Sequence, residues 1–141
     1  MKTIDNNEKE LKVSVQCENH EEQDKLLSFV KHFNSKIYVQ KNGREYILSM
    51  EDIYYIESLE KTTIIYTQND SYVSMMWLYQ IEAMLSDDFV RINKSTIINL
   101  SYLKSMKSDI GSRIRLEFNN GDKFMVTRAY VKTFKRKLGG N

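Results

Sequence analysis

The fold class is decided by one stretch near the C-terminus, Arg113-Ile114-Arg115-Leu116-Glu117-Phe118-Asn119-Asn120-Gly121-Asp122-Lys123-Phe124-Met125-Val126. Polar and apolar residues alternate without a break from Arg113 to Phe118, which is the period of a strand with one buried face. The next four residues are turn formers, and a second apolar run follows them directly. The stretch therefore predicts a β-hairpin.

Short strand-like runs of the same kind fill the sequence before this hairpin. The Asn42-Gly43 pair is a turn signal between the first two runs. The runs are Ile37–Val39, Glu45–Leu48, Ile53–Ile56, Thr63–Tyr66, Tyr72–Met75, Phe89–Ile92 and Thr96–Leu100. Many short strands separated by turns indicate a mainly β protein built from antiparallel sheets.

Two short helices are expected beside these strands, over Trp77–Leu85 and Tyr130–Leu138. The spacing places Leu78, Ile81 and Leu85 on one face of the first, and Val131, Phe134 and Leu138 on one face of the second. The aromatic and Met residues of the first helix are most simply explained as core residues.

The N-terminal part predicts a small β-α unit. Residues Leu11–Cys17 alternate at strand period, and His20–Phe33 reads as an amphipathic helix. We expect residues 1–35 to form an accessory element and residues 36–141 the main domain. The accessory element is a candidate for dimerisation or partner contact, with simple packing against the sheets as the alternative. It is too short for a receiver domain, which would need roughly 100 residues.

The composition is that of a packed globular protein. The chain has 141 residues, no proline, 41% hydrophobic residues and 28% charged residues. The N-terminus is too polar for a signal peptide, and no apolar run approaches the roughly 20 residues of a membrane span. The single cysteine, Cys17, has no internal disulfide partner. We therefore expect a soluble protein of the reducing cytoplasm.

The charge is unevenly distributed along the chain. The net charge is only +2, yet residues 1–85 hold 9 Lys/Arg against 14 Asp/Glu, while residues 86–141 hold 12 against 5. This asymmetry suggests a face that binds a polyanion, with a charge split that serves no partner as the alternative.

Catalytic constellations are not apparent. The two histidines, His20 and His32, are twelve residues apart and do not share a helical face as a metal pair would. Cys17 falls on the apolar side of its predicted strand, which favours a buried residue over a nucleophile. No nucleophile, base and orienting group can be assembled, so we expect no enzyme, no cofactor, no metal and no small-molecule substrate.

The segment Phe89–Leu100 is the most informative for function. It is dense in donors that suit phosphates and base edges: Arg91, Asn93, Lys94, Ser95 and Asn99. A second cluster of such side chains is Thr127–Lys132, and a third candidate is the polar loop Ser58–Thr63. Each of them alone is a weak signal.

Together, and in this order, these segments resemble the LytTR DNA-binding domain of bacterial transcription regulators. The matching pieces are Asp52–Ser58, Phe89–Ser95 with Ile98-Asn99, Asn120–Asp122 and Val126–Tyr130. The resemblance runs from about Ile37 to Leu138. It implies elongated antiparallel sheets with little helix, and DNA contacts made by loops that enter successive major grooves.

Carried over by position, the contact loops are Lys61–Thr63, Asn93–Ser95 and the neighbourhood of Arg128. The candidate DNA-binding residues are Lys61, Thr63, Arg91, Asn93, Lys94, Ser95 and Arg128. Three of them have structural alternatives: Arg91 bracing its loop, Ser95 making a turn hydrogen bond, and Arg128 pairing to cap the last helix. Asn99 is expected to close a strand end and Tyr130 to pack beneath the loop. For the cations of the last helix, contact with phosphates and a solvated helix face are equally good interpretations.

The resulting hypothesis is a stand-alone, LytTR-type transcription regulator that binds double-stranded DNA. The resemblance also suggests a small membrane protein that restrains the regulator, and the N-terminal unit is the candidate for forming a homodimer. The alternative is a β-rich protein–protein interaction module without DNA binding.

Overall fold

The computed structural model describes residues 21–25 and 36–139. The chain divides into two compact units, Met1–Asn34 and Ser35–Asn141. In the first unit, residues 21–25 are helical and fall inside the predicted helix His20–Phe33. The rest of that helix and the predicted strand Leu11–Cys17 lie outside the described residues. The accessory role of residues 1–35 stays a prediction.

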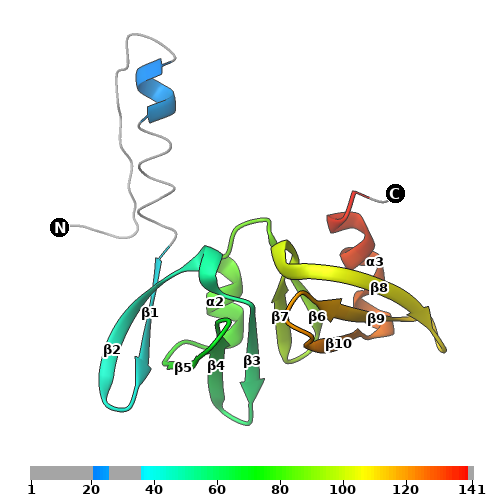
Figure 1. The fold of residues 1–141 in the computed structure, drawn as a ribbon, viewed down its shortest axis with the longest axis horizontal. Helices are drawn as coiled ribbons and strands as arrows, with labels where there is room; N and C mark the ends of the chain where they lie inside the picture. Colours follow the sequence, from blue (N-terminus) through cyan, green and yellow to red (C-terminus); the bar gives the residue numbers. More distant parts are fainter. Residues whose placement is uncertain (1–20, 26–35, 140–141) are drawn as a thin grey trace. The chain divides into compact units, whose positions relative to one another are not determined.

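The second unit is mainly β, as the sequence predicts (Figure 1). Its strands are β1 (Lys36–Lys41), β2 (Arg44–Ser49), β3 (Tyr55–Leu59), β4 (Thr62–Tyr66), β5 (Ser71–Ser74), β6 (Phe89–Asn93), β7 (Thr96–Asn99), β8 (Leu103–Asp109), β9 (Arg113–Phe118) and β10 (Lys123–Val126). Its helices are η1 (Met50–Asp52), α2 (Leu78–Met84), η2 (Leu100–Tyr102) and α3 (Arg128–Lys137). The strands form a seven-stranded sheet, in the order β2-β1-β5-β4-β3-β7-β6, and a three-stranded sheet, β10-β9-β8. All pairings are antiparallel.

The turn chemistry of the sequence explains two of the hairpins. Lys41 pairs with Arg44, so Asn42 and Gly43 form a two-residue connection, with φ values of 52° and 78°. Positive φ at both positions is what the tightest hairpin turns require, and Asn-Gly adopts it readily. The predicted β9–β10 hairpin is also present, with Gly121 at φ 94° in its turn.

Strand β7 is the wall between two hydrophobic cores, and all four of its residues are buried. Ile97 belongs to the core formed with α2, whereas Ile98 belongs to the core under the small sheet and α3. Successive side chains of a strand point to opposite faces, so one strand can serve both cores. Strand β6 does the same with Phe89 and Val90. The β6–β7 hairpin therefore packs against a hydrophobic core on each of its two faces.

Aromatic rings hold the small sheet against the large one. Tyr55 stacks on Tyr66 with ring centroids 4.2 Å apart, and its edge meets Phe124 of β10 at 4.7 Å. Phe124 continues to Phe118 at 4.9 Å. Burial and the neighbouring Tyr66 raise the pKa of Tyr55 to about 12. The contact between Tyr55 and Phe124 thus joins the two sheets.

The structure corrects three sequence expectations. Strand β8 was not predicted, because its central residues are polar and exposed and it is an edge strand with no apolar alternation. The aromatic residues of the α2 segment are not core: Trp77 is 52% exposed and Tyr79 is 66% exposed. Only Phe134 of the α3 stripe is fully buried, and Leu138 is 41% exposed just after the helix ends.

Candidate nucleic-acid interface

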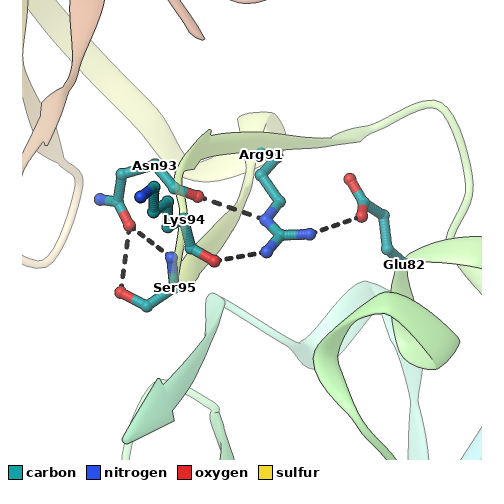
Figure 2. Close-up of polar contacts among 5 residues, drawn as sticks. All are labelled: Glu82, Arg91, Asn93, Lys94 and Ser95. Atoms are coloured by element: carbon teal, nitrogen blue, oxygen red, sulfur yellow. Dashed lines mark hydrogen bonds and ion pairs between the residues drawn. The ribbon is translucent and has the colours of Figure 1, made fainter. Parts of the chain in front are cut away.

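The β6–β7 loop is held in one shape by two of its own polar side chains (Figure 2). The side-chain oxygen of Asn93 accepts from the backbone N–H of Ser95 at 2.9 Å and from its hydroxyl at 3.2 Å. A register shift in β6 at this point gives the loop room to close in this way. The amide of Asn93 therefore shapes the loop first, whatever else it contacts.

Arg91 braces the same loop from the side of α2. Its guanidinium donates to the carbonyl of Asn93 at 3.2 Å and to the carbonyl of Lys94. Its remaining arm pairs with Glu82 of α2 at 2.8 Å. Figure 2 shows the guanidinium lying between the loop carbonyls and the carboxylate. This is the bracing role that the sequence left open for Arg91, and Glu82 is a supporting residue that the sequence did not indicate.

Lys94 lies at the apex of this braced loop and is exposed. Its backbone carbonyl is tied to Arg91, while the close-up shows no polar contact of its ammonium group with the residues drawn. A rigid backbone below an unburied cation lowers the entropy lost when that cation binds an anion.

Two backbone hydrogen bonds bring three separate segments together at this loop. The N–H of Ser58, at the end of β3, donates to the carbonyl of Ser95 at 2.8 Å. The N–H of Thr127, just before α3, donates to the carbonyl of Ile92 at 3.0 Å. The β3–β4 turn, the β6–β7 loop and the start of α3 are therefore neighbours. They are the three segments singled out in the sequence.

In the β3–β4 turn, the two positions predicted to contact DNA differ. Lys61 is exposed in a two-residue turn whose other residue, Glu60, has φ 57°. Thr63 is only 3% exposed because β4 is flanked by β3 and β5, with Ser58 and Ser74 as its register partners. Thr63 is therefore buried in the structure, whereas Lys61 is accessible, and the DNA contact of both residues stays a prediction.

Arg128 is exposed at the first residue of α3. The helix N-terminus adds partial positive charge beside the guanidinium, so this position favours an anion. Tyr130 packs against the second core, in agreement with its predicted structural role. Asn99 is 2% exposed, donates to the carbonyl of Ile53 at 2.9 Å and accepts from Ser101, so it closes the end of β7 as predicted.

The cations of residues 86–141 are spread beyond these loops. Five lie in β8–β10 and five in α3, which leaves Arg91 and Lys94 in the β6–β7 hairpin. Lys137 is 3.6 Å from the carboxylate of Asp87 and ties the last turn of α3 to the start of β6. The charge asymmetry is therefore not explained by the three contact segments alone.

The sequence matches the family model of the LytTr DNA-binding domain over residues 43–139. The chain belongs to this family. Its LytTr domain has the fold of a solved LytTr DNA-binding domain from Bacillus cereus, with a TM-score of 0.71 at 24% identity, covering 74% of this chain and 97% of that one. The family is described as a DNA-binding domain.

Curated relatives of the LytTr domain are bacterial regulators. It is 31% identical over 102 residues to the sensory transduction protein LytT of Enterococcus faecalis and 29% identical over 102 residues to LytR of Staphylococcus haemolyticus. These alignments span 72% of this chain but only 42% and 40% of the relatives. An uncharacterized HTH-type transcriptional regulator of Staphylococcus aureus is 26% identical over 66% of this chain and 63% of its own length.

Within residues 21–25 and 36–139, no His, Cys, Asp and Glu side chains group in a way that could hold a metal ion. In the same ranges no helix has the length and apolar content to cross a bilayer.

Proposed function

We propose that this LytTr domain regulates transcription by binding duplex DNA sequence-specifically through the major groove. The β3–β4 turn, the β6–β7 loop and the start of α3 form the contact surface. One observation carries the proposal: backbone hydrogen bonds join these segments, and each presents one exposed cation, Lys61, Lys94 or Arg128.

The chemistry of the cations assigns them different tasks. The planar fork of an Arg can grip O6 and N7 of guanine together, so Arg128 reads a base. An ammonium is a point charge that suits a phosphate or a single acceptor, which is the role of Lys61 and Lys94. Asn93 and Ser95 act mainly by holding the loop, since their polar groups bond to each other.

The test compares Arg128→Ala with Lys135→Ala, which removes the same charge from the last turn of α3. Binding is measured at one fixed salt concentration on a site selected from a random duplex library and on its scrambled version. Arg128→Ala should cost about 1–3 kcal/mol on the selected site and relax preference at one base position. Lys135→Ala should have a much smaller effect, and Ser95→Ala a small and equal effect on both duplexes.

Two results would contradict the proposal. Equal losses for Arg128→Ala on selected and scrambled DNA would make Arg128 a phosphate contact instead of a base reader. Absence of any salt-sensitive DNA binding by the intact chain would favour the alternative, a protein–protein interaction module, because counterion release accompanies binding to a polyanion.

The remaining parts of the hypothesis are the homodimer, the restraining membrane protein and the cytoplasmic location. We infer that residues 1–35 provide self-association. Deleting them should leave a folded domain that occupies a half-site but has lost cooperativity on a two-site operator. Unchanged cooperativity, or a truncation that fails to fold, would remove the support for this role.

A further inference from the structure

The two sheets have four edge strands, β2, β6, β8 and β10, and β2 differs from the other three. An exposed edge offers unpaired backbone groups to other chains, so proteins usually cover it, shorten it, charge it or break its register. β6 is covered at the point where Thr127 donates to the carbonyl of Ile92, and β10 has only four residues. β8 carries Lys104 and Lys107 and has a register shift near its start.

Within residues 36–139, β2 has none of these protections along its apolar half. It pairs with β1 over six residues without a shift, and no described strand pairs with its other side (Figure 1). Its two charged residues, Arg44 and Glu45, lie next to the turn, whereas Tyr46 and Ile47 follow as exposed apolar side chains. The strand is therefore a template for pairing with another chain.

The backbone groups of alternate β2 residues point away from β1. A two-residue turn closes on a hydrogen-bonded pair, which here is Lys41 and Arg44. Hydrogen-bonded and non-hydrogen-bonded pairs alternate along an antiparallel ladder, so Glu45 directs its N–H and carbonyl outward. Ile47 and Ser49 do the same. The outer side of β2 therefore presents donors and acceptors at the spacing that a further antiparallel strand requires.

The outer face of the β1–β2 hairpin also presents apolar surface. Ile37 and Val39 of β1 are buried, so Tyr38 between them points to the opposite face. Its register partner is Ile47, and the two side chains are 73% and 61% exposed. An additional strand beside β2 would cover much of this surface.

We propose that β2 is a self-association surface, where two copies of the chain pair their β2 strands antiparallel about a two-fold axis at Ile47. This register puts Tyr46 opposite Leu48 of the second copy. It also puts Glu45 opposite Ser49 of the second copy, so no like charges face each other, whereas a register centred on Glu45 would oppose two carboxylates. The contact is isologous, as a two-fold axis requires. This inference rests on the proposed homodimer and gives it an interface.

Charge complementarity favours a second copy over an unrelated strand. On the outer face, Lys36 is the register partner of Ser49, and Glu45 is the register partner of Gln40. In the proposed dimer Lys36 of one copy and Glu45 of the other lie in one row, on either side of the short Ser49. Two strand spacings, about 9.6 Å, separate their backbones, and two long side chains span that distance. The two-fold axis repeats this pair, while within a single chain the two residues lie at opposite ends of the hairpin.

The first test is sedimentation velocity of the full chain over a concentration series without DNA, so its outcome is independent of the proposed DNA binding. Ile47→Lys places two ammonium groups at the axis and should weaken the dimer by about tenfold or more. The control is Ile110→Lys, the same substitution at a side chain that is 81% exposed in residues 110–112, the β8–β9 tip. It should dimerise like the unaltered chain, and circular dichroism checks that both variants fold.

The second test reverses the two charges one at a time. Lys36→Glu alone and Glu45→Lys alone each bring like charges together in a homodimer and should weaken it by about threefold to tenfold at low salt. Mixing the two variants should restore the dimer, because each pair across the axis again joins a carboxylate to an ammonium. A substitution that only damaged the fold would not be rescued by mixing.

Three results would overturn the inference. A monomeric unaltered chain would remove the proposed homodimer as well. A dimer that Ile47→Lys leaves intact would place self-association elsewhere, with residues 1–35 as the remaining candidate. Mixed charge variants that associate no better than either alone would exclude this register. A dimer that uses both β2 and residues 1–35 loses affinity when either contact is removed, so the two assignments are tested by different changes.

Discussion

The β6–β7 loop and the β8–β9 tip are both held in shape by polar side chains, but these side chains come from different parts of the fold. In each, an arginine donates hydrogen bonds to loop carbonyls and an Asn or Asp side-chain oxygen accepts from a loop N–H, and the exposed side chains include Lys94 in one and Ile110 in the other. The loop draws its brace from another element, since Glu82 of α2 pairs with Arg91. Within residues 36–139, the side chains that brace the tip come from its own hairpin.

This difference has a physical consequence for how the two loops respond to change. The β6–β7 loop is locked to the core on both sides and to β3 and α3, so its shape depends on the whole fold. Among the residues that the structure describes, Asp109, Arg113 and Arg115 make the side-chain hydrogen bonds and the ion pair that hold the β8–β9 tip. Substitution of the residues that brace the loop should therefore disturb the whole contact surface, whereas substitution of the residues that hold the tip should disturb the tip alone.

The largest expected effect comes from removing the brace of the loop. Arg91→Ala deletes two bonds to loop carbonyls and the pair with Glu82, so we expect a loss of about 1.5–3 kcal/mol in DNA affinity. Arg91→Lys should not restore binding, because a lysine lacks the planar fork that reaches both carbonyls and the carboxylate. Titration of both variants on the selected site measures this. Full rescue by lysine would mean that Arg91 acts only through its charge.

A smaller effect is expected from the residue that the loop presents. Lys94→Ala should lower affinity by a similar factor on selected and scrambled DNA and reduce the slope of log K against log salt by about 0.9, the value for one phosphate contact. Lys94→Arg should keep the slope. The measurement is a salt series of binding isotherms, with circular dichroism to confirm folding. An unaltered slope for Lys94→Ala would place its ammonium away from the phosphates.

The β3–β4 turn offers a comparison within one hairpin. Lys61→Ala should weaken binding modestly, by about 0.5–1 kcal/mol, whereas Thr63→Val should leave DNA affinity unchanged because Thr63 is buried. Competition binding at equal protein concentration distinguishes the two. A loss of affinity for Thr63→Val without loss of thermal stability would show that the turn opens to expose Thr63 on DNA.

The smallest expected effect is a loss of stability of the β8–β9 tip at low pH. The hydrogen bond from the Ile110 N–H, together with Arg115, lowers the pKa of Asp109 below its ordinary value. The folded tip therefore prefers the ionised carboxylate, and this contribution to stability is present above the ordinary pKa and lost as pH falls through the lowered one. We expect the protection factor of the Ile110 amide against hydrogen exchange, which corrects for the pH dependence of the intrinsic rate, to fall as the pH drops below the ordinary Asp pKa of about 4.

Asp109→Asn is the control for this pH effect, since its side chain does not titrate. Opening of the tip with the same midpoint in Asp109→Asn would assign the acid response to another group.

The sequence by itself determined the class of fold and the family. Three local signals could be read without knowing any tertiary contact: the alternation in β9, the Asn42-Gly43 turn and the turn residues before Gly121. The order of the three polar segments was also readable, as was the structural role of Asn99. Strand β8 was not, because an exposed edge strand buries no stripe of side chains that could leave a pattern.

Only the tertiary structure decided which polar residues are buried and which partners they contact. The burial of Thr63 depends on the strands on either side of β4, and the exposure of Trp77 and Tyr79 depends on which face of α2 meets the core. The pairing of Arg91 with Glu82 joins two elements, and the bonds from Ser58 and Thr127 join segments far apart in the chain. Spacing along a sequence records the period of a strand or helix, whereas contacts between elements depend on register and packing, which no local pattern encodes.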